Sequence, residues 1–315
     1  MGQLTGDALG SMVEFMSREE IARLYPGGLR KIGPSTVFGT VAGQPTDDSE
    51  MALALTRSLL PNGYNPEAAA IAYGRWYNSA PFDIGTATRQ ATAAMARAAA
   101  RGESASEAAY AHADAETEAN GGLMRQSPLA IWGSSLDSEA LDGIVRADTR
   151  LTHPSVVCQD ASATFIVAVA AVIMDGLSAE AAYKAALEWN KTHGSSAKIT
   201  RALQDAAHKP PHYQPHQGHV PIALQNAFYQ ALNATSFEEG IVATVMGGGD
   251  TDTNAAIAGA LLGAVHGLEA IPGQWREAIL TCRPAQGASG VQRPRPEEYW
   301  PAEALELAEK LLAHG

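Results

Sequence analysis

Hydrophobic residues recur every three or four positions along most of the chain, and short loops rich in Gly, Pro and Asn separate these stretches. Such a period places them on one face of an α-helix, whereas a half-buried strand would alternate at every second position. No segment alternates beyond a few residues, and neither an internal repeat nor a long linker divides the chain. We therefore expect one all-α domain over residues 1–315. The pattern predicts helices over residues 48–60, 66–79, 86–102, 104–118, 126–132, 136–149, 159–174, 178–191, 199–207, 220–233, 236–245, 254–267 and 301–312.

Composition and charge narrow the classes of partner. The 315 residues carry a net charge of −12, with 46% hydrophobic and 6% aromatic residues. An excess of negative charge argues against a protein that binds nucleic acid or an anionic membrane surface. The apolar runs at 163–174 and 255–265 are too short to span a bilayer, so we expect core helices there.

The cysteines and the start of the chain bear on the compartment. Cys158 and Cys282 lack the C-x-x-C spacing and suggest no disulfide framework, which suits a reducing environment. The first residues lack the basic and apolar regions of a secretory signal. We expect a cytoplasmic protein that acts as a monomer.

Four histidines fall within residues 208–219, in the segment HKPPHYQPHQGH. Histidines so close together can be metal ligands, but three prolines prevent a helix that would gather them on one face. No Cys or acidic residue accompanies them. We predict a proline-stiffened surface loop rather than a zinc site.

Two carboxylates open the apolar helix predicted at 254–267. Asp250 and Asp252 follow a run of glycines, with threonines between and after them. Helix capping is one interpretation, because Asp and Thr side chains accept bonds from the free N–H groups of a first turn. An EF-hand loop is excluded, since its sixth and twelfth positions need Gly and Glu where this chain has Ala255 and Leu261.

A second acidic cluster, Thr46-Asp47-Asp48, opens another apolar helix. If the two helix starts face each other, four carboxylates converge, and so many like charges in a buried site require cations. Carboxylate and hydroxyl oxygens favour hard ions such as Mg²⁺ or Mn²⁺, and two such ions are the usual arrangement for a set of this size. The two clusters therefore predict a divalent metal site.

Small residues recur every four positions in the helix behind Asp250, at Ala255, Gly259, Gly263 and Gly267. Such a stripe lets a neighbouring helix approach closely, and close packing would hold the metal-bearing turn rigidly.

Three further segments suit the surroundings of a metal site. TGDALGSMVEF carries Asp7 and Glu14, with Gly6 and Gly10 four positions apart. NGGLMRQSP, at residues 120–128, offers glycine N–H groups before a helix, which can hold a diphosphate. LTHPS places His153 in a loop bounded by proline. Each segment alone is equally consistent with a simple turn or a structural histidine.

Together these motifs resemble the ADP-ribosylglycohydrolase family, and the resemblance covers nearly the whole chain. The paired TDDS and GDTDT motifs in this order are its most specific part. It implies an all-α fold, a binuclear Mg²⁺ or Mn²⁺ centre, and hydrolysis of the glycosidic bond that links ADP-ribose to a protein side chain. The motifs that carry it are Gly6-Asp7-Ala8-Leu9-Gly10 with Glu14, Thr46-Asp47-Asp48-Ser49, Asn120-Gly121-Gly122-Leu123-Met124-Arg125, Thr152-His153 and Gly249-Asp250-Thr251-Asp252-Thr253.

The resemblance also implies roles for individual residues. It implies that Glu14 reaches the metal site and assists the ribose or the water, and that Asp48 or Glu14 accepts the proton of the water. Asp83, in APFDIGTATRQA, would lie near the leaving guanidinium, as an aspartate does in the arginine-specific bacterial branch. The implied metal ligands are Thr46, Asp47, Asp48, Asp250, Asp252 and Thr253. The implied substrate-binding residues are Asn120, Gly121, Gly122, Met124 and His153.

The expected activity is metal-dependent hydrolysis of ADP-ribosyl-arginine in a modified protein, with ADP-ribose as product. A carboxylate at Asp83 favours arginine, because it pairs with a guanidinium through two bonds, although a helix N-cap explains this residue equally well. Hydrolysis of O-linked ADP-ribose, on serine or in O-acetyl-ADP-ribose, is the alternative with the same fold. A non-enzymatic ADP-ribose binder and a phosphohydrolase that releases AMP are the others.

The chain departs from the family at its start, because the GDALG motif begins at Gly6 where relatives have about ten more residues before it. We expect from this either a truncated start or a short first helix.

Overall fold

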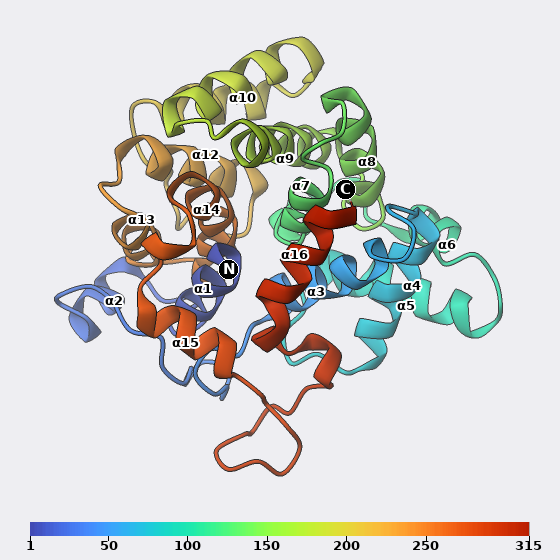
Figure 1. Ribbon diagram of the computed structural model, residues 1–315, viewed down its shortest axis with the longest axis horizontal. Coiled ribbons are helices and arrows are strands. Elements are labelled where there is room, and N and C mark those ends of the chain that lie inside the picture. Colours follow the sequence, from blue (N-terminus) through green and yellow to red (C-terminus); the bar gives the residue numbers. More distant parts are fainter. Residues whose placement is uncertain (315) are drawn as a thin grey trace.

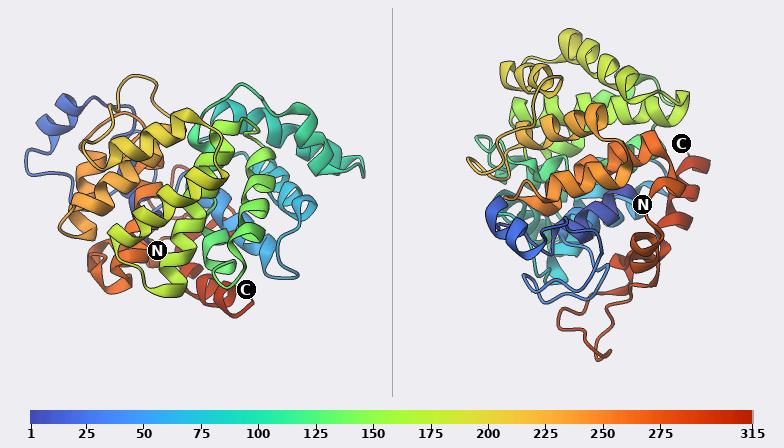
Figure 2. Two further views of the ribbon diagram at one scale, coloured as in Figure 1. Left: turned by 90° about the horizontal axis from the view of Figure 1, so that it is seen from above. Right: turned by 90° about the vertical axis from the view of Figure 1, so that its left-hand side faces the viewer.

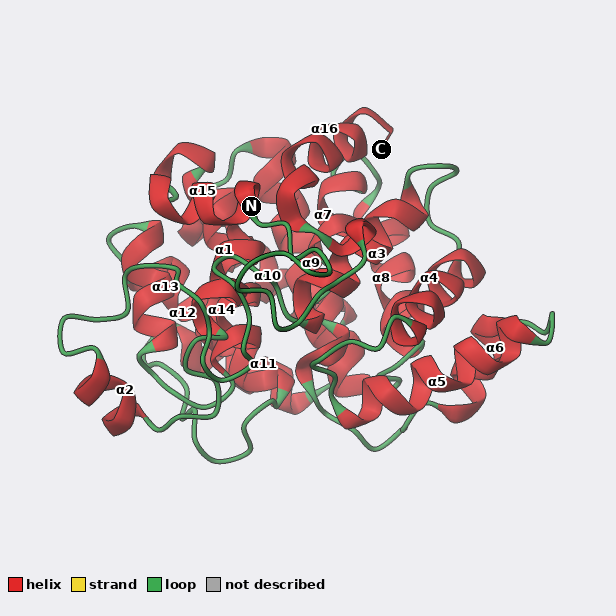
Figure 3. Ribbon diagram, turned by 90° about the horizontal axis from the view of Figure 1, so that it is seen from below, coloured by secondary structure: helices red, strands yellow, loops and turns green. Residues whose placement is uncertain are grey.

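The all-α prediction is confirmed by a computed structural model, which describes residues 1–314. Over these residues the chain forms α-helices and short 3₁₀ helices, with isolated bridges but no strand (Figure 3). The elements are α1 (Gly2–Gly10), α2 (Arg18–Leu24), α3 (Asp47–Leu59), α4 (Pro66–Asn78), α5 (Thr86–Ala100), α6 (Ala105–His112), η1 (Asn120–Gly122), α7 (Ser127–Trp132), α8 (Ser138–Arg150), α9 (Val156–Asp175), α10 (Ala179–His193), α11 (Ala197–Ala206), α12 (Val220–Asn233), α13 (Phe237–Val245), α14 (Thr251–His266), η2 (Leu268–Ala270), α15 (Gly273–Thr281), η3 (Glu297–Tyr299), η4 (Pro301–Glu303) and α16 (Ala304–His314).

Each of the thirteen predicted helices has a counterpart, but the one predicted at 104–118 is too long. Helix α6 ends at His112, and the side chain of Asp114 accepts a hydrogen bond from the backbone of Glu116. Such a local side-chain bond offers the backbone an alternative to the helix. Part of the segment that follows the helix, residues 116–119, lines a cavity.

Helices α2 and α15 were not predicted. Helix α2 begins with a capping box, in which Ser17 and Glu20 bond to each other's backbone N–H. Its seven residues bury only Ile21, so the sequence shows no apolar face there. Helix α15 buries Trp275 and Ile279, which is too few positions for a periodic signal.

The close approach expected behind Asp250 occurs between α1 and α14, which lie side by side (Figure 1). A Cβ atom at Gly6 would overlap the backbone of Ala255, and one at Gly2 would overlap that of Gly259. The small-residue stripe therefore lets the two backbones touch. Gly267 takes no part in it, because it follows the last helical residue with a φ of +80°.

Helix α9 lies at the centre of the fold and packs against α7, α8, α10, α12 and α14. It has 20 residues, and its most apolar window of 18 residues has a mean hydropathy of 2.0, so by length and composition it could cross a membrane, contrary to the prediction from the shorter apolar run. In the structure 78% of its most apolar window is buried inside the protein, as in a core helix.

Helices α4, α5 and α6 form one end of the molecule, and α2 lies at the other (Figure 2). Between these ends, the first turns of α3 and α14 approach each other, and a side-chain contact joins Thr253 to Asp48. The two acidic clusters of the sequence therefore meet near the middle of the chain's fold.

Candidate active site

The turn that begins α3 is held by a residue from α1. The Asp7 carboxylate accepts hydrogen bonds from the backbone N–H of Thr46, at 3.1 Å, and of Ser49, at 3.2 Å. The side chain of Thr46, at the N-cap position, makes no capping bond itself. Asp7 thus caps the N-terminus of α3 from another helix, which leaves Asp47 and Asp48 available for other contacts.

The turn that begins α14 is likewise not capped by its own N-cap side chain. The carboxylate of Asp250 instead accepts a bond from the side-chain amide of Asn120, at 2.8 Å. The hydroxyl of Thr253 lies 3.3 Å from Oδ2 of Asp48, which is also 3.2 Å from the hydroxyl of Thr46. Asp252 accepts a bond from the backbone N–H of Thr253, but capping does not account for Asp250, and the two helix starts are joined through Asp48.

A third segment brings Glu14 to the same place. One carboxylate oxygen from each of Glu14, Asp250 and Asp252 lies within 4.8 Å of the others, and all three residues are buried. Oxygens at such separations are close enough to bind one cation together.

Burial and mutual repulsion act together on these carboxyl groups. Burial, followed by the charges of Asp83 and Asp250, raises the pKa of Glu14 to about 9. Burial and neighbouring carboxylates also raise the pKa values of Asp47, Asp48 and Asp252 well above the ordinary range. The negative charges are thus unfavourable as they stand.

Two buried carboxylate oxygens of the cluster, Oε2 of Glu14 and Oδ1 of Asp48, have no hydrogen-bond partner within residues 1–314. A buried acceptor without a partner is costly, so its presence points to a missing ligand. An all-oxygen donor set with excess negative charge and unpartnered oxygens fits hard divalent cations.

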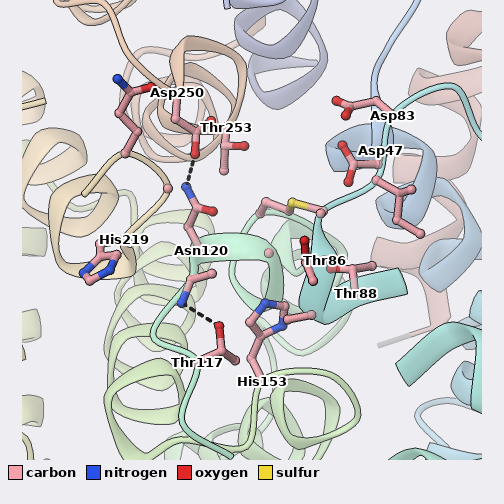
Figure 4. A pocket seen from close by; sticks show the side chains of 18 of the residues that line it. Asp47, Asp83, Thr86, Thr88, Thr117, Asn120, His153, His219, Asp250 and Thr253 are labelled. Atoms are coloured by element: carbon pink, nitrogen blue, oxygen red, sulfur yellow. Dashed lines mark hydrogen bonds between the residues drawn. The ribbon is translucent and has the colours of Figure 1, made fainter. Parts of the chain in front are cut away.

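Asp83 lies beside this cluster, on the loop between α4 and α5. The carboxyl groups of Asp83 and Asp47 lie near each other (Figure 4), and burial together with the charge of Asp83 raises the pKa of Asp47. Asp83 is only half-buried, and burial raises its pKa above the ordinary value. Its carboxyl group is thus accessible from the cavity to a cationic partner.

A cavity of about 690 Å³ opens over the acidic cluster. Its walls come from the loop 83–88, from residues 116–121 and from residues 217–219, while Glu14, Asp250 and Asp252 line its base. An antiparallel bridge between Ala119 and His219 joins the second of these segments to the third. The backbone N–H of Asn120 bonds to the carbonyl of Gly218 at 2.8 Å.

Most of the predicted site residues line this cavity, including Asn120, Gly121, Met124 and His153. Figure 4 shows Asn120 beside Asp250 and His153 farther from the acidic cluster. Thr46 and Asp48 lie behind the surface of the cluster rather than on it. Gly122 does not line the cavity either, because it faces the side chains of Thr149 and His153.

Several cavity residues were not predicted from the sequence. His219 closes the histidine-rich loop, whose residues 208–218 are largely exposed, and its ring centroid lies 5.0 Å from that of His216. Phe15 lies at the rim with 64% of its surface exposed and a φ of +59°. A positive φ is rare for a bulky residue and can mark a functional position. For Phe15 this sign is visible only in the structure.

Comparisons with known proteins agree with this arrangement. A family model described as ADP-ribosylglycohydrolase matches residues 1–313. The chain is 31% identical over 283 residues to the ADP-ribosyl-[dinitrogen reductase] glycohydrolase of Rhodospirillum rubrum, covering 87% of this chain and 86% of the relative. It is 26% identical over 295 residues to the ADP-ribosylarginine hydrolase Tri1 of Pseudomonas putida, covering 89% of this chain and 72% of the relative.

A solved structure described as an ADP-ribosylglycohydrolase-related protein complex superposes on the chain with a TM-score of 0.77 and 27% sequence identity. The superposition covers 99% of this chain and 95% of that one. Since the family match, the sequence relatives and the fold all extend over nearly the whole chain, this protein belongs to the ADP-ribosylglycohydrolase family.

Proposed function

We propose that this protein hydrolyses the N-glycosidic bond between ADP-ribose and an arginine side chain of a modified protein, with the help of two divalent cations. The observation that carries the proposal is the meeting of the two acidic helix starts at the base of one cavity, with Asp83 at its edge. Two relatives, an ADP-ribosyl-[dinitrogen reductase] glycohydrolase and an ADP-ribosylarginine hydrolase, support the same chemistry.

The cations would be held by residues of the two helix starts. The proposed ligands are Thr46, Asp47, Asp48, Asp250, Asp252 and Thr253, and Mg²⁺ or Mn²⁺ suits their oxygens. Bound there, the ions would supply positive charge that orients the ribose hydroxyls and lowers the pKa of a water molecule.

The remaining residues surround the other parts of the substrate. Asp83, half-buried beside Asp47, would pair as a carboxylate with the arginine guanidinium. The backbone of Gly121 and the ring of His153 face the cavity and would bind the diphosphate.

Glu14 is the better candidate for the general base. Both Glu14 and Asp48 have an unpartnered oxygen, but Glu14 lines the cavity, whereas Asp48 lies behind it. Hydrolysis places the hydroxyl of water on the anomeric carbon of the ribose. Glu14 would take the second proton of that water and the guanidine would leave as the C–N bond breaks.

The test is release of ADP-ribose from one peptide modified on arginine and one modified on serine, each with Mg²⁺, Mn²⁺ or EDTA. We expect cation-dependent release from the arginine peptide. Release from the serine peptide alone would discard the role of Asp83 and favour O-linked substrates. AMP as product would indicate a phosphohydrolase, and binding without release would indicate an ADP-ribose binder.

Two variants sharpen this test. Asp83→Asn removes the charge that would meet the guanidinium, and we expect activity on the arginine peptide to fall at least about 100-fold. Asp175→Asn changes an exposed aspartate at the end of α9 and serves as the matched control. Equal activity of the two variants would show that Asp83 does not recognise arginine.

A further inference from the structure

We infer that Arg125 and Thr152 are positioning residues that hold His153 in a single tautomer, with its Nε2–H directed to the cavity as a donor for an anionic oxygen of the ligand. The identity of that oxygen, a phosphate of ADP-ribose, rests on the proposed function. The tautomer itself rests only on the hydrogen bonds around His153.

Arg125 is completely buried, although it points to no ligand. Its guanidinium forms an ion pair with Asp148, at 3.3 Å, and lies 4.5 Å from the centre of the Tyr73 ring. One of its terminal nitrogens, Nη1, donates to the hydroxyl of Thr152 at 2.7 Å and to the carbonyl of Gly121 at 3.3 Å. A buried guanidinium held on so many sides has a fixed orientation.

The direction of the next hydrogen bond follows from the number of protons. The oxygen of Thr152 lies 2.8 Å from Nδ1 of His153. Arg125 can only donate, so the Thr152 oxygen accepts from it and has its own hydroxyl proton left to give. Nδ1 of His153 is the only acceptor within reach of that hydroxyl among residues 1–314, so Nδ1 carries no proton.

A neutral histidine whose Nδ1 accepts a bond must carry its proton on Nε2. Burial, together with the nearby charge of Arg125, lowers the pKa of His153 to about 3, so the ring stays neutral at ordinary pH. Nε2 makes no hydrogen bond within the described chain, and His153 lines the cavity. The ring therefore offers one free donor to whatever occupies the cavity.

The same arginine also fixes the wall next to this donor. Arg125 bonds to the carbonyl of Gly121, and a Cβ atom at Gly121 would come within 2.9 Å of Cε1 and 3.1 Å of Nε2 of His153. The backbone of Gly121 donates no hydrogen bond to another group of residues 1–314. Two unpartnered N–H groups, those of Gly121 and His153, thus belong to neighbouring residues of the cavity wall, an arrangement that suits a phosphate oxygen.

The tautomer is measured directly by two-bond ¹⁵N–¹H correlation NMR of the ligand-free protein labelled on histidine. The signals of His153, one of nine histidines, are assigned by their loss in His153→Gln. We expect a neutral ring with the proton on Nε2 in the wild type. A proton on Nδ1, or a charged ring at neutral pH, would overturn the inference.

Binding of free ADP-ribose, measured by calorimetry, tests whether Nε2–H of His153 donates to the ligand. In Thr152→Val the hydroxyl is lost, and we expect a mixed tautomer and an affinity lower by a factor of about ten or more, as for loss of a hydrogen bond to a charged group. Thr152→Ser keeps the hydroxyl and should restore both properties. Thr56→Val, which removes a buried hydroxyl bonded only within α3, is the matched control for the cost of the substitution itself.

Unchanged affinity in Thr152→Val, with the tautomer altered, would show that the ring does not serve the ligand. The NMR result in the wild type does not depend on catalysis. A protein that shows the expected tautomer but releases no ADP-ribose would therefore overturn the proposed function and leave the positioning of His153 standing.

Discussion

Asp7 accepts hydrogen bonds from both the backbone N–H and the hydroxyl of Thr46, at 3.1 Å and 3.0 Å, across 39 positions of sequence. This contact joins α1 to the first turn of α3, and Asp7 is fully buried. Thr46, the first of the proposed metal ligands in the chain, is therefore held by a side chain that is not itself placed among them.

We predict that Asp7→Asn lowers the free energy of unfolding by about 1–3 kcal/mol, because the amide replaces a charged acceptor of several buried bonds. It should also weaken Mn²⁺ binding at least about tenfold, since the turn that carries Asp47 loses its support. Urea denaturation and calorimetry measure the two effects. Asp175→Asn is the control, and unchanged Mn²⁺ affinity in Asp7→Asn would show that the turn holds its shape without Asp7.

Asp252→Asn should separate the charge repulsion in the cluster from its cation binding. Without metal, the variant should unfold at a higher temperature than the wild type, because one of several buried like charges is gone. With Mg²⁺ or Mn²⁺, the wild type should gain stability with rising ion concentration and the variant should gain little. Thermal unfolding in EDTA and in increasing Mn²⁺ measures both. An equal gain in wild type and variant would place the cation elsewhere.

The stability of the metal-free protein should fall as pH rises from about 5.5 to about 8.5. Burial raises the pKa of Asp7 to about 6 and that of Glu14 to about 9, whereas unfolded carboxyl groups titrate near pH 4. The folded state therefore binds more protons across this range, and the free energy of unfolding decreases with pH.

Saturating Mg²⁺ should oppose this decrease, because the cation binds the deprotonated carboxylates and binds them more tightly at higher pH. Urea midpoints at several pH values, in EDTA and in Mg²⁺, test the prediction. If the metal-free protein instead becomes more stable as pH rises from about 5.5 to about 8.5, the carboxyl groups do not destabilise one another.

Two glycine substitutions test the contact between α1 and α14. Gly6→Ala would drive a methyl group into the backbone of Ala255, and we expect a loss of about 3 kcal/mol or more in the free energy of unfolding. Gly143→Ala, in the exposed middle of α8 with open space around it, should instead stabilise the protein by about 0.5–1 kcal/mol. Similar effects from both substitutions would contradict the close packing.

The class of fold could be predicted because helical periodicity is a local property, set by the repeat of the α-helix and readable in any window of the chain. The acidic clusters were also readable, because the Asp-Asp and Asp-Thr-Asp spacings lie within single turns. The short helices α2 and α15 were not predicted, since their burial depends on the distant elements that cover Ile21 and Trp275.

Only the tertiary structure decided which of these local features meet. The contact of Thr253 with Asp48 spans 205 positions, and that of Asn120 with Asp250 spans 130. The repulsion between Asp47 and Asp83 and the surroundings of His153 likewise depend on groups that are brought together only in the folded chain. Most of the helices and the kinds of ligand atoms that they carry could be read from the chain alone. The packing of helices such as α1 and α14 brings these ligand atoms together in one cavity. The burial and the charge at each group then depend on every element that surrounds it.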